Sequence, residues 1–194
     1  MTALSAEILA NYQIRKTKKQ KDRFIRLMQS AYPNLQIQTG GFSKSRNLVL
    51  GNVEQAKILL TAHYDTCATL PFPNFITPKN PVIYIIYNLF LIVPFFVIMV
   101  FCSALLHLIS DNFLFNYFSV LALYASSLLL LLFGPANKHN ANDNTSGVIT
   151  LCELYARLTP EEKSQVCFVF FDNAESGLLG SRYYKKTYKH ILNN

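Results

Sequence analysis

The chain has 194 residues, of which 51% are hydrophobic and only 15% charged, and it carries a net charge of +7. Ordinary globular domains contain about 25% charged residues, so this composition argues against a wholly soluble protein of average surface. The positive charge does not indicate a nucleic-acid partner, because no recognised binding motif or base-stacking platform accompanies the basic residues.

The first part of the chain predicts one helix followed by short strands. Residues 5–30 predict a helix, residues 35–39 and 46–50 predict two strands, and residues 57–62 predict a buried strand that ends at His63. A basic cluster over residues 15–26 lies within the predicted helix. Such a cluster is typical of a solvated helix face, and next to a membrane it could also touch anionic headgroups.

The middle of the chain is strongly apolar. Residues 80–137 contain no Lys or Arg, although the chain has 18 of them. Within this stretch, residues 82–109 and 113–133 carry no formal charge, and each run exceeds the roughly 20 residues that cross a bilayer core. Only residues 110–112 separate the two runs, so they predict an antiparallel transmembrane hairpin. The alternative is a buried hairpin in a soluble protein, which would need a far larger protein to cover it.

The charges around the hairpin predict its orientation. Lys79 precedes the first run and Lys138 follows the second, whereas the turn carries only Asp111. Because basic residues stay on the cytoplasmic side, both flanking parts are expected to face the cytoplasm from an inner (cytoplasmic) membrane.

The last part of the chain returns to an alternation of helix and strand. Residues 145–158 predict a helix, residues 166–171 a central strand and residues 178–187 another helix. The whole pattern predicts an α/β fold, with helices on both faces of a sheet that the hairpin interrupts. The expected parts are residues 1–80, the hairpin over 81–135, and residues 136–194.

Three separated segments hold residue types that bind metals. The first, at residues 61–66, contains His63 and Asp65; the second, at residues 141–148, contains Asp143; the third, at residues 170–181, contains Glu175. Imidazole and carboxylate groups are zinc ligands in hydrolytic sites, and they also suit Mn, Co or Fe. The segments lie far apart in the chain, so only a folded domain could bring them together.

These segments resemble the dinuclear zinc aminopeptidases of metallopeptidase family twenty-eight, over roughly residues 1–80 and 136–194, and specifically a membrane-anchored bacterial-type member. The resemblance implies that His63 and Glu175 are metal ligands, that Asp143 bridges two zinc ions, and that Asp65 orients the His63 ring. It also implies a cis peptide bond after Asp143. The expected activity is the removal of N-terminal residues from short peptides by means of a bridging water.

The chain departs from the family pattern at the general base. The family has two adjacent glutamates, and Glu175 matches the second because it stands one residue before Ser176-Gly177-Leu178. Ala174 therefore occupies the position of the general base, and a methyl group cannot accept a proton. Either an introduced Glu-to-Ala change or a natural one would produce this pattern. We expect little turnover from the chain as written.

Several alternatives stay open at this point. The family implies two more ligands, an aspartate and a histidine, beyond residue 194, so we expect a fragment of a longer protein or an incomplete site. The family also holds carboxypeptidases and a cyclase, and the sequence does not separate these subtypes. A non-catalytic pseudopeptidase that binds a peptide or a partner protein is the alternative to an enzyme. The oligomeric state has no signal in the sequence.

Overall fold

The structure is a computed structural model, and it describes residues 1–69 and 80–192. The chain divides into two compact units, Met1–Ala68 with Pro135–Asn194 and Thr69–Gly134. We call them the α/β unit and the apolar unit and describe each by itself. Lys79, which entered the predicted orientation, lies outside the described residues.

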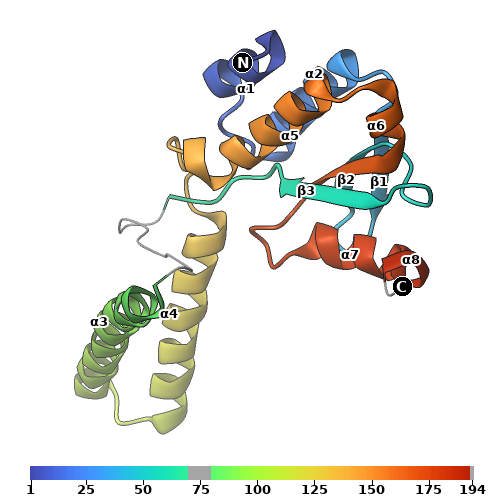
Figure 1. Cartoon of the computed structure of the whole chain (residues 1–194). Helices are drawn as coiled ribbons and strands as arrows, with labels where there is room; N and C mark the ends of the chain where they lie inside the picture. Colours follow the sequence, from blue (N-terminus) through green and yellow to red (C-terminus); the bar gives the residue numbers. More distant parts are fainter. Residues whose placement is uncertain (70–79, 193–194) are drawn as a thin grey trace. The chain divides into compact units, whose positions relative to one another are not determined.

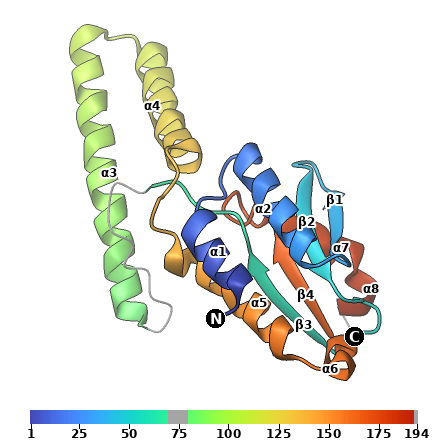
Figure 2. The same cartoon turned by 90° about the horizontal axis from the view of Figure 1, so that it is seen from above.

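The α/β unit contains a four-stranded sheet in the order β1-β2-β4-β3. Its strands are β1 (Gln36–Gly40), β2 (Ser45–Leu50), β3 (Ile58–His63) and β4 (Val166–Phe171). β3 and β4 run parallel, with His63 opposite Phe171, while β2 pairs antiparallel with both β1 and β4. Figure 2 shows β3 and β4 side by side, although more than a hundred residues separate them in the chain. The predicted strands are confirmed to within one residue at each end.

Helices cover both faces of this sheet (Figure 1). Helices α1 (Ala3–Asn11), α2 (Lys18–Ala31) and α5 (Ser146–Arg157) pack on one face, and α7 (Leu179–Thr187) and α8 (Lys189–Leu192) lie on the other. β4 alternates between the two cores, because Phe168 and Phe170 face the first and Cys167 and Val169 face the second. The mixed helix and sheet arrangement agrees with the predicted α/β class.

The predicted single helix over residues 5–30 is wrong, because the structure has two helices there. α1 ends at Asn11 and α2 begins at Lys18. Thr17 caps α2 by accepting a hydrogen bond from the backbone N–H of Gln20, whose side chain in turn accepts from the N–H of Thr17. This capping box starts a new helix and leaves residues 12–17 as an irregular linker.

A similar capping box starts a short helix that the sequence analysis did not predict. α6 (Pro160–Gln165) begins after Thr159, which exchanges hydrogen bonds with Glu162. Pro160 suits the first turn, where its missing N–H would have no helical partner. α6 leads the chain from α5 into β4.

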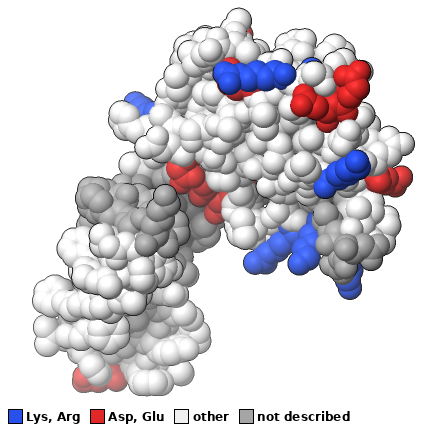
Figure 3. Space-filling model, in the orientation of Figure 1, with Lys and Arg blue, Asp and Glu red and all other residues white. Residues whose placement is uncertain are grey.

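The apolar unit holds two long helices, α3 (Pro81–Ile109) and α4 (Phe113–Phe133). They contact each other through their aromatic side chains, with the ring centroids of Phe95 and Tyr124 5.8 Å apart. The predicted helical hairpin therefore forms. The face shown in Figure 3 has its Lys and Arg on the α/β unit, in keeping with a sequence that has none over residues 80–137.

The prediction that both helices cross a membrane is supported for α3 only. Among the described residues, α3 is the helix with the length and apolar composition of a membrane span. The most apolar 18-residue window of α3 has no buried residue in the structure. In α4 the apolar run among the residues whose side chains the structure describes is Phe113–Ser127, so α3 alone stands as a candidate span in this part of the chain.

Candidate metal site

His63 is the last residue of β3, at the carboxyl end of the two parallel strands. Its Nδ1 atom lies 3.1 Å from the backbone carbonyl oxygen of Asp65 and 3.5 Å from a carboxylate oxygen of the same residue. This contact fixes the ring so that Nε2 faces Asp143, whose carboxylate oxygen is 3.6 Å away. A metal-binding histidine commonly has its second ring nitrogen held in this way.

Asp143 lies in an irregular turn, Ala141–Thr145, directly before α5. The peptide bond between Asp143 and Asn144 is cis, as the resemblance implied, and neither residue has helical dihedral angles. The side chain of Asn144 turns back and donates a hydrogen bond of 2.9 Å to the carbonyl oxygen of His63. The turn that carries Asp143 is thereby tied to the end of β3.

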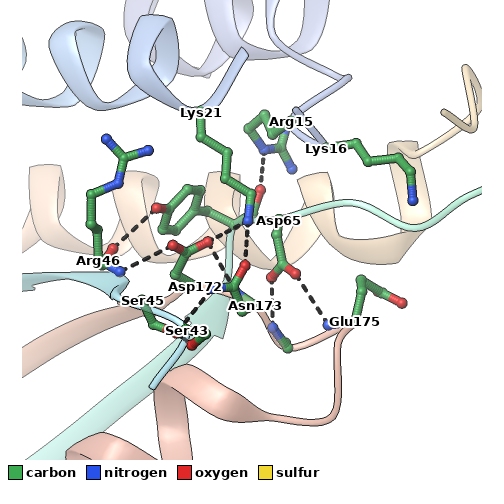
Figure 4. Close-up of polar contacts among 12 residues, drawn as sticks. Arg15, Lys16, Lys21, Ser43, Ser45, Arg46, Asp65, Asp172, Asn173 and Glu175 are labelled. Carbon is green, nitrogen blue, oxygen red and sulfur yellow. Dashed lines mark hydrogen bonds and ion pairs between the residues drawn. The ribbon is translucent and has the colours of Figure 1, made fainter. Parts of the chain in front are cut away.

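Glu175 lies in the loop that follows β4, and Asp65 holds this loop in place. One carboxylate oxygen of Asp65 accepts a hydrogen bond from the backbone N–H of Ala174 at 3.0 Å, and the other accepts from the N–H of Glu175 at 3.1 Å (Figure 4). Asp65 is 3% exposed, so these contacts form away from bulk water. The predicted role of Asp65 was to orient His63; the structure shows that it also anchors the segment carrying Glu175.

The rest of this loop depends on a close approach at Gly180. A Cβ atom at Gly180 would lie 2.2 Å from the carbonyl oxygen of Asp172 and 2.5 Å from the side-chain oxygen of Asn47. Asn47 donates to the carbonyl of Gly180 and accepts from the N–H of Asp172. Only glycine therefore lets α7 start against the end of β4.

The three predicted ligands converge. One ligand atom from each of His63, Asp143 and Glu175 lies within 4.8 Å of the others. His63 and Glu175 are half-buried and Asp143 is exposed, so the cluster is open to solvent on one side. Three ligands with an open position are typical of catalytic zinc sites.

The charges of the cluster act strongly on one another. Burial lowers the pKa of the His63 imidazole, but its contacts with Asp143 and Asp65 outweigh burial and raise that pKa to about 10. His63 holds the pKa of Asp143 below its usual value, whereas burial and the neighbouring Asp143 raise the pKa of Glu175. Without a metal, the imidazolium thus balances part of the carboxylate charge.

These features fit a divalent cation. The carboxylate of Asp143 raises the pKa of the neighbouring Glu175, so a cation bound by both groups would relieve their repulsion, and Nε2 of His63 completes a donor set of one nitrogen and two carboxylates. This set suits zinc. The described residues supply one such cluster of three; the predicted second zinc ion is not tested by it.

The family model described as "Peptidase family M28" matches residues 126–194 of the chain. The match supports the metallopeptidase family M28. It covers Asp143, Ala174 and Glu175, and it agrees at the family level with the resemblance found from the sequence. No curated protein and no solved structure matches the chain.

Within this M28-like site, Ala174 contributes its backbone rather than its side chain. Its N–H binds Asp65, and its carbonyl oxygen accepts hydrogen bonds from Gly177 and Leu178 at 3.1 and 2.9 Å. The loop around Ala174, where the resemblance implies a general base, is therefore held by backbone hydrogen bonds. The catalytic role of position 174 stays a prediction.

The sequence analysis missed two buried cations next to the site, Arg15 and Lys21. Lys21 forms an ion pair of 2.6 Å with Asp172 and donates to the side chain of Asn173 at 2.7 Å (Figure 4). Arg15 contacts the segments around His63 and Asp143. Both belong to the basic cluster interpreted as a helix face, and the capping pattern Thr17-x-x-Gln20 was the available signal that the helix breaks between them.

Proposed function

We propose that the chain is a membrane-anchored, zinc-dependent peptidase module of the aminopeptidase type, whose turnover is suppressed by Ala174. The observation that carries this proposal is the convergence of His63, Asp143 and Glu175 within 4.8 Å, from segments up to 112 positions apart in the chain. Support comes from the M28 match over residues 126–194 and from that family's general dependence on zinc. Short peptides are the proposed substrates.

Each site residue has a distinct task in this proposal. His63, Asp143 and Glu175 would hold the metal, with Asp143 as the bridge to a second ion. When bound, the metal would lower the pKa of a water molecule and polarise the scissile carbonyl. Asp65 keeps the His63 ring oriented and holds the backbone of residue 175 in place.

The remaining step is the transfer of a proton from the attacking water, which neither Ala174 nor the metal ligands would perform. A glutamate at this position would take the proton from the attacking water and pass it to the departing amine. A positioned general base contributes roughly 10²- to 10⁴-fold to a rate, so the chain as written would retain at most a small residual activity. Metal and peptide binding do not require that proton transfer.

The strand order supports a membrane hairpin with two crossings. β3 precedes the apolar unit and β4 follows it, yet the two strands pair in the same sheet. Both ends of the apolar unit must therefore emerge on the same side of any membrane, so if α3 crosses, α4 must return. The basic residues all lie outside residues 80–137, which supports a cytoplasmic position of the α/β unit at the inner membrane.

The test is to restore the base in the full chain, purified in mild detergent with added zinc. Ala174→Glu is expected to hydrolyse aminoacyl reporter peptides at least 100-fold faster than the unchanged chain. Ala174→Gln is the matched control, because it has similar size and cannot accept a proton, and it should stay inactive. Combining Ala174→Glu with Glu175→Ala should abolish the activity. Reporters blocked at the N terminus, and reporters for carboxypeptidase and cyclase activity, identify the subtype.

A second candidate is a non-catalytic pseudopeptidase that binds peptide or a partner protein. The observation that favours it is Ala174 itself, set in a loop whose N–H groups at residues 174 and 175 both donate to Asp65. This candidate predicts that Ala174→Glu stays silent while zinc still binds. It would then be tested by peptide binding to the zinc-loaded chain.

A further inference from the structure

Arg15 is a fully buried cation in the linker between α1 and α2. The whole residue is 0% exposed, although it belongs to a run of basic residues that are otherwise largely at the surface. Its guanidinium lies over the ring of Phe24, with 5.2 Å between its central carbon and the ring centroid. Burying a charge is unfavourable unless its donors are paired, so the contacts of Arg15 must explain its position.

Those contacts reach two of the segments that carry metal ligands, and Figure 4 shows Arg15 beside the segment of Asp65. The Nε atom donates to the carbonyl oxygen of Tyr64, directly after His63, and the backbone N–H donates to the hydroxyl of Thr66 at 3.0 Å. The Nη2 atom donates to the hydroxyl of Thr145, two residues after Asp143, at 3.1 Å. Nη1 donates to the carbonyl of Tyr12, which fixes the linker itself.

The guanidinium therefore joins the end of β3 to the start of α5. A planar group with five donors can hold acceptors on two segments at a set separation, whereas a lysine ammonium presents a single flexible point. The two segments that it joins carry His63 and Asp143, whose ligand atoms lie 3.6 Å apart.

We propose that Arg15 is a positioning residue of the metal site, which holds the His63 and Asp143 segments at the spacing that a metal ion needs. This inference rests on the metal site proposed above. Arg15 touches no ligand atom in the described contacts and acts through Tyr64, Thr66 and Thr145.

The direction of the change in metal affinity distinguishes a positioning role of Arg15 from an effect of its charge alone. A buried cation repels a divalent metal, so a role through charge alone predicts that Arg15→Met tightens metal binding. A positioning role predicts the opposite. Changes in groups that orient metal ligands typically weaken metal binding by about 10- to 100-fold, and we expect a loss of that size for Arg15→Met.

The experiment is a Co²⁺ titration of the full chain in detergent, followed by the visible absorption of the bound ion. Arg15→Met should weaken Co²⁺ binding and change the positions of the absorption bands. Arg15→Lys should also bind Co²⁺ more weakly, because lysine keeps the charge but lacks the planar guanidinium that joins the two segments. Met28→Ala is the matched control: Met28 is fully buried in α2 and should lower the melting temperature while leaving Co²⁺ affinity unchanged. Competition with zinc, the metal proposed above, then gives the zinc affinities of the same variants.

A milder variant covers the case in which Arg15→Met does not fold. Thr145→Val removes one acceptor of Arg15 while keeping the shape of a buried side chain, and it should weaken Co²⁺ binding and shift the same bands. Unchanged affinity and spectrum in Arg15→Lys and Thr145→Val, or tighter binding by Arg15→Met, would overturn the inference. If instead the unchanged chain does not bind Co²⁺, or Glu175→Ala binds it equally well, the metal site itself is wrong.

Discussion

Removing the carboxylate of Asp65 should destabilise the α/β unit by an amount that depends on how many backbone N–H groups lose their acceptor. In the structure the two oxygens of Asp65 accept from two consecutive amides, at 3.0 and 3.1 Å. An unpaired buried donor costs about 1–3 kcal/mol, and because these amides are only partly buried we take about 1–2 kcal/mol for each. Asp65→Ala is therefore expected to lower the free energy of unfolding by about 2–4 kcal/mol.

Asp65→Asn tests this reasoning more closely, because it keeps one acceptor oxygen at the same place. Both variants lose the ion pair with His63, but in Asp65→Asn only one amide should lose its partner, so its loss should be smaller than that of Asp65→Ala by roughly 1–2 kcal/mol. The control is Asp22→Ala, which removes a partly exposed ion pair with Arg46 and should cost about 0–1 kcal/mol.

The assay is urea denaturation of the metal-free chain in mild detergent, followed by the near-UV circular dichroism of its 11 tyrosines. Metal must be absent because binding would add its own stabilisation. Equal losses for Asp65→Ala and Asp65→Asn, or a loss for Asp65→Ala no larger than that of the Asp22 control, would refute the role of Asp65 as a double acceptor.

Three further predictions follow from charges and topology. The contacts of His63 with Asp143 and Asp65 raise its pKa to about 10 in the folded chain, above its unfolded value. The stabilisation from protonated His63 is therefore complete below about pH 6.5 and is lost as the pH rises toward 10. The melting temperature of the metal-free chain should fall over this window, and His63→Gln should make that fall smaller. Lys21→Met leaves the buried Asp172 carboxylate without its cation and should lower the free energy of unfolding by about 3 kcal/mol in the same urea assay, with no such loss if the ion pair is unimportant. Asp111→Cys should react in intact cells with a membrane-impermeant maleimide well beyond the unchanged chain, and equal labelling would argue against two crossings.

Local patterns in the sequence predicted most of the individual elements. The strand Val166–Phe171 was predicted to the residue, because its run of valine and phenylalanine has both the length and the composition of a buried strand. The boundaries of α3 and α4 followed from where polar residues interrupt the apolar runs. The error over residues 5–30 arose because a basic, helix-favouring composition hid the cap at Thr17.

The candidate site was also predicted only in part from the sequence. The sequence by itself determined the donor types, the three segments that hold them and the presence of an alanine beside Glu175, because these are properties of neighbouring residues. Only the tertiary structure decided that β3 lies beside β4, that Asp65 binds the loop of Glu175, and that Arg15 is buried rather than solvated. The physical reason is that a buried polar group is stable only with its partners, and three of the four partners of Arg15 stand 49 to 130 positions from it in the chain.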